Sequence, residues 1–111
     1  LYLPESEWHE MGLLFYAFIA RKAGHETLYL GQATPFNAMS DVATRWNADI
    51  IITGSLTGLP YDRPEEYLKR LSAVFSNRKI LVAGALATAA RGKSSANVFA
   101  VNTARELKSH L

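Results

Sequence analysis

The feature that most constrains the fold is a continuous apolar run in the middle of the chain, Ile50-Ile51-Ile52. Asp49 precedes this run, Thr53 and Gly54 follow it, and it shows no alternation of apolar and polar residues. Such a short, bounded run predicts a strand that is buried on both faces, as in a parallel sheet covered by helices on either side. We therefore expect an α/β fold with a central strand over residues 49–53, followed by a loop from Gly54.

Helical and strand patterns alternate along the rest of the chain. The segments that we expect to be strands are 1–3, 27–30, 79–82 and 98–101, and those that we expect to be helices are 9–23, 35–47, 64–76, a short piece within 85–96, and the end of the chain from 103. Thr34 is the expected N-cap of the helix that begins at Pro35. Five strands alternating with helices predict a five-stranded parallel doubly wound sheet, flavodoxin-like or Rossmann-like, with right-handed crossovers.

The carboxyl ends of the strands are where such a sheet binds ligands. In this chain the residues that we expect at that edge are 5–9, 31–35, 53–60 and 84–95.

A length of 111 residues, of which 49% are hydrophobic, suits a single domain over residues 1–111. No apolar run is long enough to cross a membrane, and the chain begins without an initiator Met or a signal-peptide pattern. We expect a soluble cytoplasmic domain from a longer protein.

Several function classes are excluded by missing motifs. The chain has no cysteine, which rules out disulfides, thiolate metal sites and a cysteine nucleophile. His9-Glu10 does not open a zinc-protease HExxH motif, because the fourth residue after His9 is Leu13. No phosphate-binding glycine motif and no GxSxG elbow is present. The net charge is only +2, but every charged residue between Glu66 and Glu106 is basic, so the C-terminal half is electropositive. Because these residues are scattered over several elements, the pattern is more typical of a solvated surface than of a nucleic-acid interface, and the alternative is attraction of an anionic cofactor group or a partner.

His9 is the candidate metal ligand, because it stands at the ligand-binding edge with Glu7 two residues before it and Gly12 three residues after it. A carboxylate can hold one imidazole nitrogen and direct the other toward a metal, and a glycine lets a bulky ligand approach the backbone. The alternative is an ordinary surface or capping histidine. His25 and His110 lie beside charged residues near helix ends, where a surface role or a helix-dipole contact is the usual explanation.

The segment Glu7-Trp8-His9-Glu10-Met11-Gly12 resembles the [DE]xHxxG signature of cobalamin-binding domains, whose histidine is the lower cobalt ligand. Tyr29-Leu30-Gly31-Gln32, followed by Thr34-Pro35, is similar to the turn after the second strand of that family. Thr53-Gly54-Ser55 falls where the family has its hydroxyl-bearing Ser-x-Leu loop. The resemblance covers essentially the whole chain and is nearest to the C-terminal sensor domains of MerR-type transcription regulators of the CarH/LitR group.

This resemblance implies a role for each matching position. His9 would bind cobalt and Glu7 would hydrogen-bond to His9. The positions that would line the groove for the displaced nucleotide tail are Gly12, Thr53, Ser55 and Gly84. The family's Gly-Gly after the fourth strand is Ala83-Gly84 here.

The resemblance also implies a cofactor and a biological context. The cofactor would be adenosylcobalamin or methylcobalamin, and the function would be sensory and not enzymatic, with a light response through a photolabile upper ligand. DNA would be bound only by a separate N-terminal domain of the parent regulator, and a helical bundle of that regulator would cap the upper face of the cofactor. The homo-oligomer would form through the parent protein.

Three alternatives stay open from the sequence. One is the corrinoid domain of a methyltransferase or mutase, although Leu13-Leu14 stands here where such enzymes commonly carry Lys-Asn after the glycine. The second is a haem-binding sensor of the same fold. The third is an interaction domain that binds no cofactor.

Overall fold

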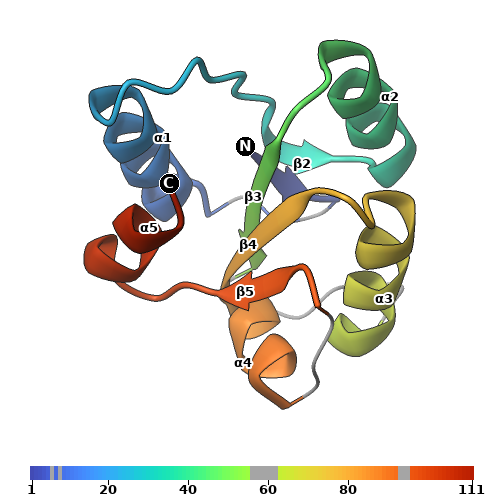
Figure 1. Ribbon diagram of the computed structural model, residues 1–111. Helices are drawn as coiled ribbons and strands as arrows, with labels where there is room; N and C mark the ends of the chain where they lie inside the picture. The colour runs from blue at the N-terminus through green and yellow to red at the C-terminus, as the bar shows by residue number, and fades with distance from the viewer. Residues whose placement is uncertain (6, 8, 56–62, 93–95) are drawn as a thin grey trace.

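The computed structural model describes residues 1–5, 7, 9–55, 63–92 and 96–111 and is an α/β fold with parallel strands between helices (Figure 1). The strands are β1 (Tyr2–Pro4), β2 (Gly31–Thr34), β3 (Ile50–Ser55), β4 (Lys79–Gly84) and β5 (Val98–Ala100). The helices are α1 (Met11–Lys22), α2 (Phe36–Trp46), α3 (Pro64–Val74), α4 (Ala85–Gly92) and α5 (Ala104–His110). The predicted alternation of strands and helices is confirmed.

The strands form two parallel sheets, and the prediction of one five-stranded sheet is wrong in this respect. One sheet pairs β1 with β2, and the other has the order β3-β4-β5. β1 lies beside β3 without a hydrogen-bonded ladder, so the spatial order is β2-β1-β3-β4-β5, an order found in flavodoxin-like folds. β1 is a three-residue strand that ends in Pro4, which has no amide hydrogen, and so it offers little backbone for pairing.

The second strand begins later than the sequence indicates. We expected a strand over 27–30, but β2 starts at Gly31, whose positive φ of 85° turns the chain. The Leu30 amide donates to the Leu1 carbonyl at 2.8 Å, so the preceding segment does run beside the start of β1. The register pairs Tyr2 with Gly31 and Pro4 with Thr34 and shifts between these pairs, so the extra residue on β2 forms a bulge.

Thr34 does not cap the second helix, contrary to the prediction. It is the last residue of β2, and its Oγ1 donates to the Gly31 carbonyl at 3.2 Å. Pro35 occupies the N-cap position of α2 in an extended conformation. The hydroxyl of Thr34 therefore hydrogen-bonds within β2 and does not accept from an amide in the first turn of α2.

β3 extends two residues beyond the predicted strand, and the expected loop does not begin at Gly54. Gly54 pairs with Ala83 and Ser55 pairs with Gly84 in the register with β4. A glycine inside a strand often marks a close approach of another group. Here a Cβ at Gly54 would lie 3.1 Å from the Ala83 carbonyl oxygen and 3.3 Å from the Ala83 Cβ.

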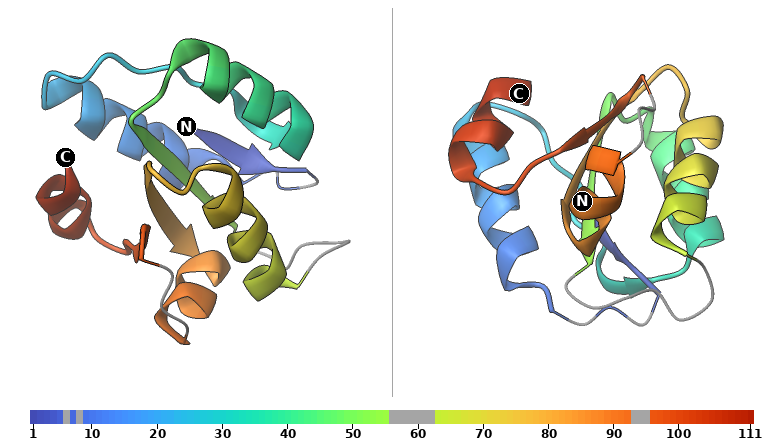
Figure 2. Two further views of the ribbon diagram at one scale, coloured as in Figure 1. Left: turned by 45° about the vertical axis from the view of Figure 1, so that its right-hand side comes forward. Right: turned by 90° about the horizontal axis from the view of Figure 1, so that it is seen from below.

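Two apolar clusters fill the space on the two faces of the sheets. In Figure 2, α1 and α5 lie on one face and α2 and α3 on the other. Side chains alternate along β3 because successive residues of a strand point to opposite faces. Ile51 belongs to the cluster that includes Met39 of α2 and Leu71 of α3, whereas Ile52 belongs to the cluster that includes Leu13 of α1 and Leu107 of α5.

Local sequence signals agree with several helix ends. Pro64 is at the start of α3, and Glu65 and Glu66 occupy its first turn, where the helix dipole favours acidic residues. The hydroxyl of Thr103 accepts a hydrogen bond from the Glu106 amide at 3.1 Å and so caps α5. Within the described ranges, no helix combines the length and the apolar character needed to span a bilayer.

Candidate functional site

A cavity of about 530 Å³ opens at the carboxyl ends of β3 and β4, beside the start of α1. Its position agrees with the edge at which doubly wound sheets bind ligands. The residues that line it are Leu3, His9, Glu10, Met11, Gly12, Leu13, Tyr16, Thr53, Gly54, Ser55, Ala83 and Gly84. Apart from His9, Glu10 and the hydroxyl-bearing residues, this lining is apolar or small.

His9, Glu7 and Ser55 form a hydrogen-bonded chain at this cavity. Glu7 is 2% exposed, whereas the side chain of His9 is 58% exposed. His9 Nδ1 lies 3.1 Å from Glu7 Oε1, and Ser55 Oγ donates to Glu7 Oε2 at 3.3 Å. The sequence-predicted contact between Glu7 and His9 is therefore present, and Ser55 reaches the same carboxylate.

The carboxylate of Glu7 determines which imidazole nitrogen can bind a metal. Because an ionised carboxylate only accepts hydrogen bonds, the 3.1 Å contact between Glu7 Oε1 and Nδ1 favours the His9 tautomer that carries its proton on Nδ1. In the neutral ring the lone pair then lies on Nε2. The Nε2 atom of His9 can thus donate an electron pair to a metal, and it belongs to an exposed side chain beside an apolar cavity.

The backbone fixes Glu7 in this position. Its amide donates to the Pro4 carbonyl at 3.0 Å, and its carbonyl accepts from the Ala33 amide at 2.9 Å. These bonds join the segment after β1 to both strands of the smaller sheet. Because the side chain is buried and the backbone is held on both sides, Glu7 can orient His9 without a large entropic cost on binding.

Small residues on α1 and on β3-β4 leave room for the cavity. A Cβ added at Gly12 would have no atom within 4 Å, so this face of α1 borders open space. Across the cavity, Gly54 and Ala83 face each other on adjacent strands, with a side chain no larger than a methyl group at either position. Gly12 was predicted to line the groove. Gly54 was predicted at the ligand-binding edge, but as a loop residue without a role in the groove, and its place directly after the buried strand was the available signal.

The other predicted groove residues take different positions. Gly84 lines the cavity with a positive φ of 67°, a conformation that favours glycine. Thr53 also borders the cavity, but by strand alternation its side chain points to the face of Ile51 and Tyr2. The Thr53 hydroxyl lies near that of Tyr2 without a hydrogen bond of normal geometry to it or to any other described group. Thr53 therefore borders the cavity mainly with its backbone.

A second polar pair joins Glu10, which lines the same cavity, to Tyr29 behind it, and this pair was not predicted from the sequence. Tyr29 Oη donates to Glu10 Oε2 at 2.9 Å. Burial, together with the hydrogen bond and the negative charge of Glu10, raises the pKa of Tyr29 to about 12. The phenol therefore remains a hydrogen-bond donor over the whole physiological pH range.

The donor set suits a metal that already carries most of its ligands. In the described part of the chain, no group of three or more His, Cys, Asp or Glu side chains could hold a bare metal ion. One histidine oriented by a carboxylate is the kind of axial ligand that a metal in a tetrapyrrole-type macrocycle requires. The apolar cavity beside His9 adds space for a further apolar part of such a cofactor.

Comparisons with known proteins support the fold. No family model matches the sequence, and no curated protein matches it. The structure is similar to the crystal structure of a novel cobalamin-binding protein from Desulfitobacterium hafniense DCB-2, with a TM-score of 0.77 and 22% identity. The match covers 98% of this chain and 56% of that protein, so this chain spans about half the length of its structural relative.

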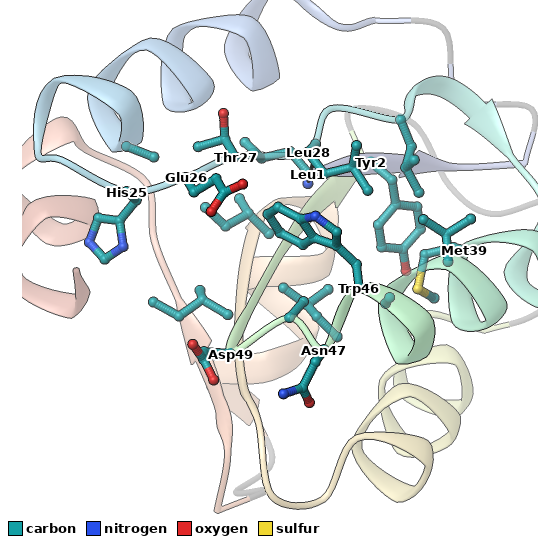
Figure 3. Close-up of a pocket in the computed structure, with 18 of the residues that line it drawn as sticks. Leu1, Tyr2, His25, Glu26, Thr27, Leu28, Met39, Trp46, Asn47 and Asp49 are labelled. Carbon is teal, nitrogen blue, oxygen red and sulfur yellow. Dashed lines mark hydrogen bonds between the residues drawn. The ribbon is translucent and has the colours of Figure 1, made fainter.

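The opposite edge of the sheets holds another cavity, of about 360 Å³ (Figure 3). It lies at the amino ends of β1 and β3, and Trp46, Asp49 and His25 are among the residues around it. His25 Nε2 is 3.2 Å from the Leu111 carbonyl oxygen, and the ring of His110 lies 4.7 Å from that of Phe99. Both histidines thus make contacts with the chain end or with the core, away from His9.

Proposed function

We propose that this chain is a cobalamin-binding sensory domain in which His9 is the lower cobalt ligand. The observation that carries the proposal is the arrangement of His9, Glu7 and Ser55 at the opening of an apolar cavity between α1 and the β3-β4 edge. The [DE]xHxxG resemblance and the similarity to a cobalamin-binding protein support it. When bound, cobalamin supplies a cobalt centre with an upper ligand that light can release.

The chain's own residues would perform three tasks. Glu7 holds the proton of His9 on Nδ1 and so keeps Nε2 available as a ligand. Leu3, Leu13 and Tyr16 offer an apolar wall against which the displaced aromatic base of the cofactor can be buried. Gly12 keeps this space open by the absence of a side chain, since a Cβ at that position would have no atom within 4 Å.

We further propose that the parent protein is a MerR-type transcription regulator, cytoplasmic and oligomeric, that binds DNA through a separate N-terminal domain and responds to light. The Leu13-Leu14 sequence after Gly12 supports a sensor over a corrinoid enzyme. Leu13 is buried in the core, and the exposed face of α1 carries large apolar residues, namely Met11, Leu14, Phe15 and Phe18. Such a face beside the cofactor suits contact with a further part of the parent protein, and the proposal assigns no catalytic step to the chain.

Cofactor retention tests the proposal. Protein mixed with hydroxocobalamin should keep about one cofactor per chain through gel filtration, with a visible spectrum of nitrogen-ligated cobalt. His9→Ala should abolish the histidine-ligated spectrum, because it removes the Nε2 donor. His25→Ala and His110→Ala are matched controls that should leave the spectrum unchanged.

Two results would contradict this function. A colourless wild-type protein after gel filtration would exclude cobalamin as the cofactor. An unchanged spectrum in His9→Ala would show that another histidine or the cofactor's own base is the ligand. The regulatory context is tested by the N-terminal sequence of the parent protein, where a helix-turn-helix domain is expected and an enzymatic domain would overturn it.

A further inference from the structure

Glu10 lines the cavity, and its side chain is held by two neighbours from β2 and the segment before it. Tyr29 Oη donates to Glu10 Oε2 at 2.9 Å. A Cβ at Gly31 would lie 3.5 Å from Tyr29 Cε1 and 3.8 Å from Glu10 Oε2, so both side chains pack against the glycine backbone. The carboxylate is therefore fixed in place, although Glu10 is only half-buried.

The charge that this cavity presents is negative. Glu10 follows His9 in the chain, and both residues line the cavity. The lining contains no lysine or arginine among the described residues, and the buried carboxylate of Glu7 stands behind His9. Among the residues of this lining that the structure describes, a macrocycle bound to His9 would therefore meet the carboxylate of Glu10 and no lysine or arginine.

Rim groups of macrocyclic cofactors differ in a way that a carboxylate can distinguish. The rim of cobalamin carries neutral carboxamides, whose N–H groups donate hydrogen bonds. Haem carries propionates, and unamidated corrinoids carry several carboxylates, which only accept hydrogen bonds at neutral pH. A carboxylate attracts the first group and repels the second.

We propose that Glu10, positioned by Tyr29, selects macrocycles whose rim is amidated and rejects those whose rim carries carboxylates. This inference rests on the proposed binding of cobalamin through His9 and adds a specificity determinant to it. Glu10 acts by direct contact with the rim of the ligand. Tyr29 acts through Glu10 and is a positioning residue.

Two corrinoids without a nucleotide tail isolate this effect. Diaquacobinamide has an amidated rim, and diaquacobyrinic acid heptacarboxylate has the same ring with carboxylates. Spectroscopic titration should give wild-type protein at least tenfold tighter binding of the first. Glu10→Gln should reduce this preference by about tenfold, mainly by tightening the binding of the heptacarboxylate, because a neutral amide can still accept a hydrogen bond from cobinamide.

Two further variants show whether the effect is local. Tyr29→Phe removes the hydrogen bond to Glu10 and should reduce the preference by about threefold. Glu26→Gln removes one negative charge at the opposite edge of the sheets and should leave the preference unchanged. Equal effects of Glu10→Gln and Glu26→Gln would show that only net charge matters and would overturn the inference.

The remaining outcomes separate the inference from the function on which it rests. If cobinamide binds with a histidine-ligated spectrum that His9→Ala abolishes, but Glu10→Gln leaves the preference unchanged, the specificity inference is wrong and cobalamin binding stands. If cobinamide shows no histidine ligation in the wild type, the proposed function fails and the inference falls with it.

Discussion

At the scale of single residues, the site depends on a buried carboxylate with two hydrogen-bond donors. Glu7 accepts from His9 on one oxygen and from Ser55 on the other. Burying such a group is costly unless both oxygens have partners. The exposed imidazole, in contrast, contributes little to the core, so His9 can be changed at a small cost in stability while its partner remains bonded to Ser55.

Replacing Glu7 by glutamine should weaken cobalamin binding by about 10- to 100-fold, the usual effect of removing a group that orients a metal ligand. The amide presents only one oxygen to the two donors, and it contributes no negative charge to the basicity of His9. A titration followed by the visible spectrum measures the change. Glu5→Gln, an exposed position in the same segment, is the control, and equal losses in the two variants would contradict the orienting role of Glu7.

At the scale of elements, the cavity exists because α1 approaches the β3-β4 edge with small residues on both sides. Gly12 faces open space on α1, whereas Gly54 lies against Ala83 on the neighbouring strand. Both are glycines that line the same cavity, but only Gly54 is tightly packed. A side chain at position 12 would therefore occupy space in the cavity, whereas a side chain at position 54 would collide with Ala83 and disturb the packing of the two strands.

Gly12→Ala should leave the free energy of unfolding unchanged or raise it by up to about 1 kcal/mol, since alanine is the better helix former. It should weaken cobalamin binding at least tenfold, because the methyl group enters the cavity. Denaturant unfolding and spectroscopic titration measure the two effects. Gly54→Ala is the comparison and should lower stability by about 1–3 kcal/mol through overpacking; a Gly12→Ala protein that binds normally would show that the cofactor does not reach α1.

At the scale of the whole molecule, two sheets meet between β1 and β3 without a continuous ladder. In the core, the hydroxyl of Tyr2 on β1 lies 2.5 Å from that of Tyr67 on α3, a helix that packs against β3 and β4, so this contact ties β1 to the layer that covers the larger sheet. Burial and the proximity of Tyr67 raise the pKa of Tyr2 well above its usual value. The candidate site spans the same junction, because Glu7 follows β1 whereas Ser55 ends β3.

A ligand that bridges this junction should stabilise the fold as a whole. At a free cobalamin concentration 100 times the Kd, the free energy of unfolding should rise by about 2.7 kcal/mol, which corresponds to a rise in Tm on the order of 10 °C for a domain of this size. Calorimetry at matched protein concentration measures it. The His9→Ala protein at the same cobalamin concentration should gain much less, and an equal gain would mean that the stabilising contacts do not involve cobalt ligation.

The sequence by itself determined the alternation of strands and helices, the central strand and the candidate pairing of Glu7 with His9, because these depend on local periodicity and on short spacings along the chain. The tertiary structure decided which residues far apart in the sequence contact one another. It set Ser55 on the carboxylate of Glu7, Tyr29 on Glu10 and Gly54 against Ala83, and it buried the hydroxyl of Thr53. It also divided the sheet, because the pairing of β1 depends on the backbone that a three-residue strand ending in proline can offer to its neighbours.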